Sequence, residues 1–182
     1  MHIRSVIKDI LKENRGIRPR TLKKRSFNIN NLLKKKAKKI NTFTGFRRVG
    51  KTYLLFLIME KLEDESCIYF NFEDERIPES TDVLTQLLYA IEELYPQQLG
   101  ILFLDEIHII PGWSKFLRRI MDQGYQVFVT GSSSKLGLKE IPTELRGRTR
   151  NHSIFPLAFQ EYLAFKDIPT NDVDSHQQAE IN

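Results

Sequence analysis

An eight-residue segment with a glycine near each end constrains this chain more than any other feature. Residues 45–52 fit the spacing G-x-x-x-x-G-K-[ST] at every fixed position. Glycines let backbone N–H groups curl around phosphate oxygens, and the lysine of the pattern reaches the β- and γ-phosphates of a nucleotide. The segment therefore predicts a phosphate-binding loop. Its residues are Gly45, Phe46, Arg47, Arg48, Val49, Gly50, Lys51 and Thr52.

The sequence on both sides of this loop supports the prediction. Residues 40–44, Ile-Asn-Thr-Phe-Thr, are typical of a buried strand, and residues 53–59 continue as a helix that is apolar on nearly all sides. A strand, a glycine-containing turn and a helix N-terminus in this order attract anions, because unpaired N–H groups and the helix dipole meet there. The Thr52 hydroxyl at the start of the helix can bind Mg²⁺.

The rest of the chain alternates between helical and extended patterns. Apolar residues at helical spacing predict helices near 3–14, 29–39, 81–94 and 113–120, and a closing helix at 157–165. Apolar runs predict strands at 67–72, 101–104, 127–129 and 152–155. Strands that are apolar along their length and alternate with helices indicate an α/β fold, a parallel sheet covered by helices on both faces.

Two acids follow the strand predicted at 101–104. Asp105 ends an apolar run 54 residues after Lys51, and Glu106 comes next. At a nucleotide site, Asp105 can bind the Mg²⁺ ion, while Glu106 can activate a water aimed at the γ-phosphate. Both acids could instead simply end the strand. The pair following a phosphate loop favours the catalytic interpretation.

Two further polar residues, Ser132 and Arg148, are candidates for the same site, whereas His108 raises the separate question of a zinc ligand. Ser132, with Thr130 as its substitute, follows the strand at 127–129 and would lie near the γ-phosphate if that strand adjoins the loop strand; a serine-rich turn is the alternative. Arg148 could stabilise transition-state charge, within its own subunit or on a neighbour, or belong to an exposed basic turn. His108 lacks partners at zinc-ligand spacing, which favours a helix-capping or surface histidine.

The charge of the chain is unevenly distributed. Residues 1–51 hold 17 Lys and Arg against two acidic residues, whereas the remainder holds 11 against 21. The block 34–39, which contains five lysines, could bind nucleic acid or form a solvated helix face, and no aromatic residues interleave with it. No apolar run approaches the length of a membrane helix, residues 1–5 lack the apolar core of a secretory signal, and Cys67 is the only cysteine, expected as a buried small hydrophobe. We expect a cytoplasmic protein without a disulfide or a membrane partner.

Four ordered motifs make the chain similar to the AAA-type ATPase domain of a large bacterial and archaeal family. They are Gly-Phe-Arg-Arg-Val-Gly-Lys-Thr, Leu-Asp-Glu-Ile-His, Thr-Gly-Ser-Ser-Ser, and Leu-Arg-Gly-Arg followed by Phe-Pro-Leu-Ala-Phe-Gln-Glu-Tyr-Leu. The resemblance implies a three-layer P-loop NTPase with strand order 5-1-4-3-2 and ATP and Mg²⁺ as cofactors. It implies a Walker A loop at 45–52, Walker B acids at Asp105 and Glu106, a sensor at 130–132, and Arg148 as a finger or a sensor arginine. Assembly into a homo-oligomer is a further expectation.

The same resemblance divides the chain. It implies an ATPase domain at 26–166, preceded by a basic helical segment at 1–25. Residues 167–182 are polar and lack periodicity, so we expect a disordered tail or the start of a truncated C-terminal region. Members usually continue into a C-terminal region of poorly defined function.

The leading functional hypothesis is a Mg²⁺-dependent ATP hydrolase that acts on the β–γ phosphoanhydride as a switch or motor. Lys51, Glu106, Ser132 and Arg148 are its candidate catalytic residues, and Thr52 and Asp105 its candidate metal ligands. Two rivals remain open: a P-loop kinase, and a nucleotide-gated module that binds nucleic acid through the basic N-terminal third. No Asn-Lys-x-Asp motif for reading guanine occurs, which favours ATP over GTP.

Overall fold

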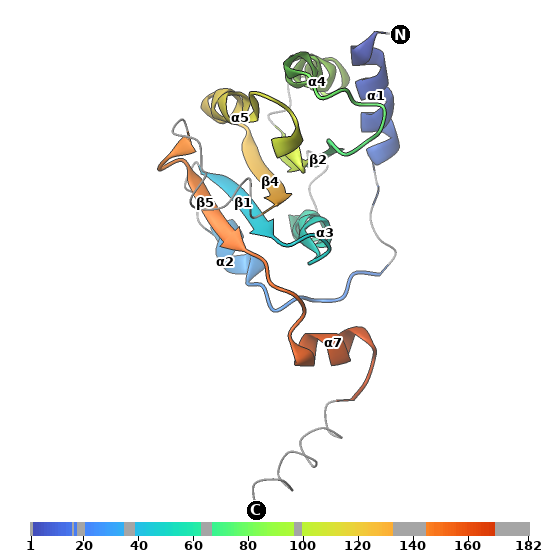
Figure 1. The fold of residues 1–182 in the computed structure, drawn as a ribbon, viewed down its shortest axis with the longest axis vertical. Coiled ribbons are helices and arrows are strands. Elements are labelled where there is room, and N and C mark those ends of the chain that lie inside the picture. The colour runs from blue at the N-terminus through green and yellow to red at the C-terminus, as the bar shows by residue number, and fades with distance from the viewer. Residues whose placement is uncertain are drawn as a thin grey trace, which may run out of the picture.

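The structure, a computed structural model, shows an α/β arrangement (Figure 1). It describes residues 2–15, 17, 21–34, 39–62, 67–96, 100–132 and 145–169. The elements are α1 (Ile3–Asn14), α2 (Ile29–Lys34), β1 (Ile40–Gly45), α3 (Lys51–Leu62), β2 (Cys67–Asn71), α4 (Thr81–Leu94), β3 (Ile101–Asp105), the 3₁₀ turn η1 (Ile107–Ile109), α5 (Trp113–Asp122), β4 (Gln126–Ser132), β5 (Thr149–Ser153) and α7 (Phe159–Phe165).

The five strands form one parallel sheet in the order β2-β3-β4-β1-β5. Counted from the β5 edge, this is the order 5-1-4-3-2, so the predicted P-loop topology is confirmed. β4 lies between β1 and β3 and brings their carboxyl ends to one edge of the sheet. In the register of the pairs, Gly45 is opposite Ser132 and Asn71 is opposite Asp105.

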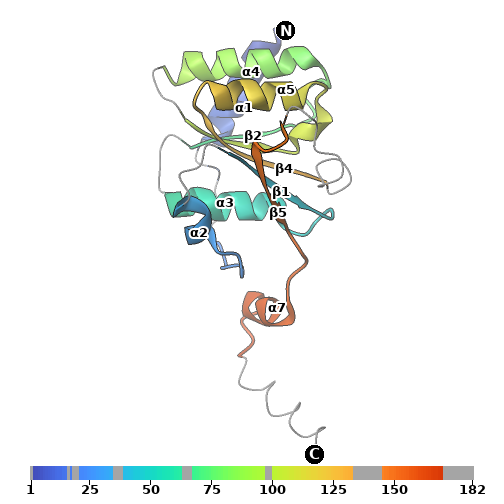
Figure 2. The same ribbon diagram turned by 90° about the vertical axis from the view of Figure 1, so that its left-hand side faces the viewer.

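Helices cover both faces of this sheet, as the apolar strands predict. α1, α4 and α5 lie on one face, and α2 and α3 on the other (Figure 2). Successive residues of β3 alternate between the two layers, because side chains of a strand point to opposite faces. Leu102 and Leu104 join the α4 side, whereas Phe103 joins the α3 side.

A row of rings crosses the α3 face of the sheet. Phe103 of β3 stacks on Phe128 of β4 at 4.8 Å, Phe128 on Phe43 of β1 at 6.4 Å, and Phe43 on His152 of β5 at 5.1 Å between centroids. Since a slip of one residue would move each ring to the opposite face, this row favours a single register for four strands. It fixes where the loop after β1 lies relative to the acids after β3.

The sequence misplaced the first residues of β5. The strand runs Thr149–Ser153, whereas the apolar pair at 154–155 suggested 152–155. β5 is the polar edge strand of the sheet, with residues only partly covered, so it carries no apolar run to mark it. Cys67 is half-buried at the start of β2 rather than fully buried. Residues 35–38 of the predicted helix 29–39 lie outside the described residues.

The basic segment proposed at 1–25 includes a helix that packs on the sheet. Ile7, Ile10 and Leu11 of α1 are buried in the same cluster as α4 and the strands. The proposed boundary at residue 25 therefore falls after a helix that shares the core. Among the described residues, none of the helices is long and apolar enough to cross a membrane.

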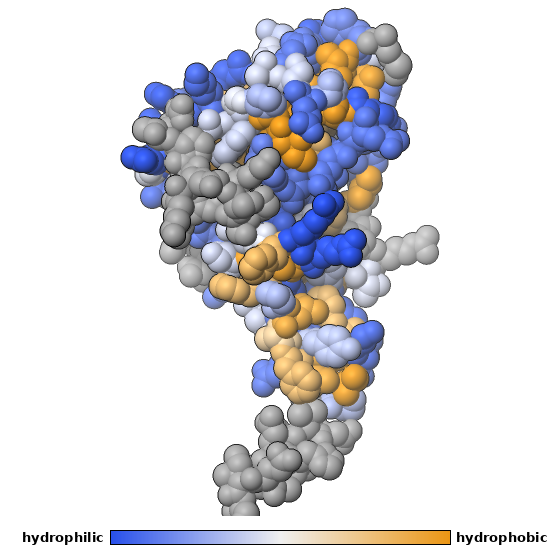
Figure 3. All heavy atoms as spheres, in the orientation of Figure 1, coloured by the Kyte–Doolittle hydropathy of each residue, from blue (hydrophilic) through white to orange (hydrophobic). Residues whose placement is uncertain are grey.

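The chain after β5 extends away from the sheet and ends in α7 (Figure 1). Apolar side chains gather at this end of the molecule (Figure 3), with Phe155 70%, Phe159 60% and Tyr162 47% exposed. A strap of residues 21–28 runs beside it: Lys23 donates a hydrogen bond to the carbonyl oxygen of Phe165, and Arg25 forms an ion pair with Glu161.

Candidate functional site

The predicted phosphate loop connects β1 to α3 at the carboxyl edge of the sheet. Each of its two glycines is required for a different structural reason. A Cβ on Gly45 would lie 2.4 Å from the carbonyl oxygen of Ile154, so the chain after β5 approaches too closely for any side chain there. Gly50 has φ of 91°, in the region that favours glycine. The loop opens directly into the N-terminus of α3, a helix of 12 residues.

Lys51, the first residue of α3, folds back over the loop. Its Nζ donates to the carbonyl oxygens of Gly45 at 3.5 Å and Phe46 at 3.3 Å. The same Nζ lies 3.3 Å from Oε1 of Glu106. The lysine side chain is only 6% exposed. The phosphate loop and the acid that follows β3 therefore share one space.

Asp105 is held rigidly at the end of β3. It is 2% exposed, and its Oδ2 accepts a hydrogen bond of 2.9 Å from the Tyr69 hydroxyl of β2. The hydroxyl of Thr130 donates to the other oxygen, Oδ1. Burial, with the charge of Asp105 beside it, raises the pKa of Tyr69 well above its usual value, so the phenol stays a hydrogen-bond donor. Each carboxylate oxygen keeps a lone pair for a further partner.

Thr130 forms hydrogen bonds with both acids. It is fully buried in β4, and besides donating to Asp105 its hydroxyl accepts the Glu106 N–H at 2.9 Å. Both hydrogen bonds fix the peptide that joins the two acids. The structure therefore places the Thr130 hydroxyl against Asp105, and its role as a substitute for Ser132 near a γ-phosphate stays a prediction.

Glu106 has an unusual backbone conformation for a residue with a side chain. Its φ of 54° is left-handed, which is uncommon for a residue with a side chain and recurs at functional sites. One carboxylate oxygen faces Lys51, and the other lies 3.3 Å from Nδ1 of His108. Burial raises the pKa of Glu106, although Lys51 acts in the opposite direction.

Of the two positions that the sequence context suggested for His108, helix-capping or surface, the structure does not show the surface position. Its side chain is 9% exposed in η1, directly beside Glu106. No zinc-type cluster of three or more His, Cys, Asp or Glu side chains occurs within the part of the chain that the structure describes. The sequence offered one signal for this position: His108 lies two residues after Glu106 in a tight turn.

A cavity of about 510 Å³ lies over these groups. It is lined by loop residues and by acids from two strand ends: Arg47, Arg48, Gly50, Lys51, Thr52, Tyr53, Glu73, Glu106, His108 and Ile109. Sequence reasoning did not assign a role to Glu73, which follows β2 and forms a 3.8 Å ion pair with the exposed Arg47. Oxygen donors at Thr52 and Asp105 are the kind that Mg²⁺ prefers, with phosphate and water completing its shell.

The structure places the two remaining candidates, Ser132 and Arg148, at opposite edges of the sheet. Ser132 ends β4 directly opposite Gly45, at the edge that carries the loop. Arg148 lies at the other edge, because its carbonyl oxygen accepts a hydrogen bond from Ile40 N–H at the start of β1. Ile40 and Gly45 are five residues apart along β1, about 17 Å at roughly 3.3 Å per residue. The structure does not bring Arg148 to the phosphate loop of its own chain.

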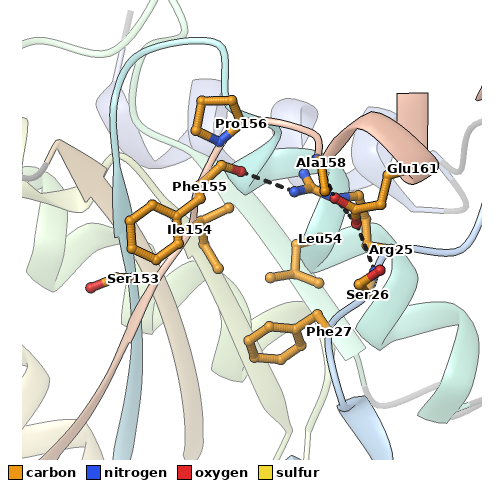
Figure 4. A pocket seen from close by; sticks show the side chains of 10 residues that line it. All are labelled: Arg25, Ser26, Phe27, Leu54, Ser153, Ile154, Phe155, Pro156, Ala158 and Glu161. Carbon is orange, nitrogen blue, oxygen red and sulfur yellow. Dashed lines mark hydrogen bonds and ion pairs between the residues drawn. The ribbon is translucent and has the colours of Figure 1, made fainter. Parts of the chain in front are cut away.

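A smaller cavity of about 220 Å³ lies between the strap and the chain after β5 (Figure 4). Phe27, Leu54, Ile154 and Phe155 give it an apolar lining, and Arg25 and Glu161 lie at its rim. α3 contributes Leu54 to this cavity and Lys51, Thr52 and Tyr53 to the larger one, and the smaller cavity is not a site that the sequence predicted.

The fold and the loop define a P-loop protein of the α/β class, and comparison with known proteins specifies the family. The model of the AAA domain family matches residues 37–163, and the chain belongs to this family. It is thus an AAA-type domain of the nucleotide-binding ATPase class. The predicted resemblance is confirmed.

Two relatives are themselves uncharacterised. A Methanocaldococcus jannaschii protein is 47% identical over 130 residues, which cover 71% of this chain and 29% of the relative. A Haemophilus influenzae protein is 31% identical over 136 residues, 71% of this chain and 34% of the relative. The chain thus spans about a third of each relative's length.

Proposed function

We propose that this domain binds Mg·ATP at the loop 45–52 and hydrolyses the β–γ phosphoanhydride as an ATP-driven switch. The observation that carries the proposal is the 3.3 Å contact between Lys51 Nζ and Glu106 Oε1. It places the lysine that would neutralise the phosphates and the acid that would activate water in one enclosed space. A kinase would require room for an acceptor hydroxyl at the position that this proposal assigns to Glu106 and its water.

The chemistry follows from these positions. Phosphate oxygens compete with Glu106 for Lys51, because both bind the ammonium group. Once released, Glu106 accepts a proton from a water whose oxygen forms the new bond to the γ-phosphorus, and the bond to the bridging oxygen of ADP breaks. Loop N–H groups and Lys51 stabilise the charge that develops. Thr52 and Asp105 would hold Mg²⁺, which neutralises phosphate charge.

The direct test is phosphate release from Mg·ATP, with and without DNA. We expect the wild-type chain to release phosphate in the absence of any acceptor. A kinase would show turnover only with a second substrate. A non-catalytic nucleic-acid module would bind ATP without releasing phosphate. Lys34 lies at the end of α2, but 35–38 lie outside the described residues, so nucleic-acid binding stays a prediction.

Arg148 gives a further prediction for the same reaction. Since it lies at the amino edge of the sheet, we propose that it acts only on a neighbouring subunit in a homo-oligomer. Arg148→Ala should then lower turnover with little change in ATP affinity, because a finger stabilises charge of the transition state. Arg146→Ala, in the same turn and exposed, is the matched control and should retain turnover.

Mixing two impaired variants tests whether Arg148 acts on the site of a neighbouring subunit. Arg148→Ala protein has an intact loop, and Lys51→Ala protein has an intact finger. Partial recovery of turnover on mixing is the expected result. No recovery, together with wild-type turnover per subunit that is independent of protein concentration, would count against a role in trans.

A further inference from the structure

Arg25 joins three segments of the chain that are far apart in sequence. Its Nη1 donates to the carbonyl oxygen of Val49 in the phosphate loop at 3.0 Å. Its Nη2 donates to the carbonyl oxygen of Phe155 at 3.0 Å, and its Nε to Oε1 of Glu161 in α7 at 3.0 Å (Figure 4). The side chains of Arg25 and Glu161 are 10% and 9% exposed. A guanidinium that is nearly buried and bonded in three directions has little freedom to move.

The contact with Val49 sets the direction of one loop N–H. The described chain contains no cis peptide bond, so the carbonyl of Val49 and the N–H of Gly50 point in opposite directions. Arg25 holds this carbonyl oxygen at 3.0 Å and thereby directs the Gly50 N–H away from itself. Arg25 also lies directly against the loop, because a Cβ on Gly50 would be 3.2 Å from Nη1.

We propose that Arg25 is a positioning residue of the phosphate loop, which orients the Gly50 N–H for phosphate and couples loop occupancy to α7. The inference rests on the proposed function, since it requires a nucleotide phosphate in the loop. Arg25 lies outside residues 37–163, the part that matches the family model. It is therefore supplied by the strap that precedes the matched domain.

Glu161 is the link between Arg25 and α7. Its carboxylate accepts from Arg25 Nε, from Ser26 N–H at 2.7 Å and from Ala158 N–H at 2.9 Å. Although burial raises the pKa of Glu161, these three donors outweigh it and lower the pKa below its usual value. The glutamate is thus a charged cap at the start of α7 and the partner of the arginine that holds the loop. A shift of the loop can therefore reach α7 through this ion pair, in addition to the ring contact of Tyr53 in α3 with Phe165 in α7 at 5.8 Å.

Lys23 supplies a matched control. It belongs to the same strap and ties it to the same helix, through the carbonyl oxygens of Ala164 and Phe165 and the carboxylate of Asp167. Its side chain contacts the C-terminal end of α7, whereas only its backbone, which a substitution leaves in place, exchanges hydrogen bonds with the Tyr53 hydroxyl of α3. Loss of Lys23 weakens the strap, whereas loss of Arg25 weakens the strap and releases the Val49 carbonyl.

The test is calorimetric binding of Mg·ADP, which occupies the loop without turnover. We expect Arg25→Gln to bind about tenfold to a hundredfold more weakly than wild type, as for loss of a hydrogen bond to a charged group. Lys23→Gln should bind as wild type does. Lys51→Ala, measured in parallel, tests the proposed function itself. If Lys51→Ala loses binding while Arg25→Gln keeps wild-type affinity, the proposed function stands and the role of Arg25 is overturned.

Amide hydrogen exchange of residues 158–165 tests the coupling. Mg·ADP should slow exchange there in the wild type and in Lys23→Gln, and this response should disappear in Arg25→Gln even when ADP saturates the loop. A merely structural arginine would leave the response intact, which would overturn the coupling. If Arg25→Gln does not fold, Arg25→Lys decides, because its single ammonium cannot bond Val49 and Glu161 in the same fork geometry. It should bind ADP more weakly than wild type, and wild-type affinity would overturn the proposal.

Discussion

Replacement of Lys51 with alanine is expected to abolish measurable Mg·ATP binding. Lys51 is the cation that lies against the loop. Because its Nζ already contacts the carbonyl oxygens of Gly45 and Phe46, it is within reach of a phosphate bound in the loop. The loss of a charge-assisted contact to two phosphates should weaken affinity by about a hundredfold or more, measured by calorimetry. Undiminished affinity in Lys51→Ala would show that this loop is not the phosphate site.

The control for this variant must separate binding from folding. Lys51→Ala leaves Glu106 half-buried without its cation, which costs stability because an unpaired buried charge is poorly solvated. Thermal unfolding should therefore be measured alongside binding. Lys61→Ala, an exposed lysine in the last turn of the same helix, should alter neither quantity.

The second large effect is expected for Glu106→Gln. Glutamine has nearly the size of glutamate and can hydrogen-bond, but it cannot accept a proton from water. The variant should keep Mg·ATP affinity while phosphate release falls by roughly a hundredfold or more. Hydrolysis at the wild-type rate would remove Glu106 from the reaction and favour a kinase or a switch without turnover.

The pH profile gives an independent check on Glu106. A base must be ionised to accept a proton, and burial raises the pKa of Glu106 above the 4.5 of an ordinary glutamate. Turnover should therefore be lost as the pH falls through this raised value, and the acid limb should lie above pH 4.5. Asp105→Asn is the contrast, since it should weaken the dependence on Mg²⁺ instead.

Much of the fold was predictable because each signal was local. The apolar runs that became β2, β3 and β4 are buried on both faces, which is why they indicated a parallel sheet covered by helices. The loop at 45–52 could be predicted from its residue spacing alone. The structure adds a physical reason for each glycine: the close approach of Ile154 at Gly45 and the positive φ at Gly50. The edge strand β5 was misplaced because its residues are polar and only partly covered, so no pattern in the sequence marks its beginning.

Parts of the candidate site depended on contacts between distant residues. Thr130 was expected near the γ-phosphate, but the neighbouring strand β3 brings Asp105 against its hydroxyl. His108 was expected as a helix-capping or surface histidine, whereas the turn after β3 places its largely covered side chain beside Glu106. Arg148 belongs to a motif that suggested the site, yet the parallel direction of β5 leaves it at the far edge of the sheet.

The sequence by itself determined the chemistry of the loop, the pair of acids and the class of fold, because spacing along the chain and apolar periodicity are sufficient for these. Tertiary structure alone decided the contact of Lys51 with Glu106 and the support of the loop by Arg25. Arg25 lies 24 residues before the loop residue it holds and 136 before its ion-pair partner. No local pattern encodes such a contact, because only the folded sheet, the strap and α7 together bring the three segments within hydrogen-bonding distance.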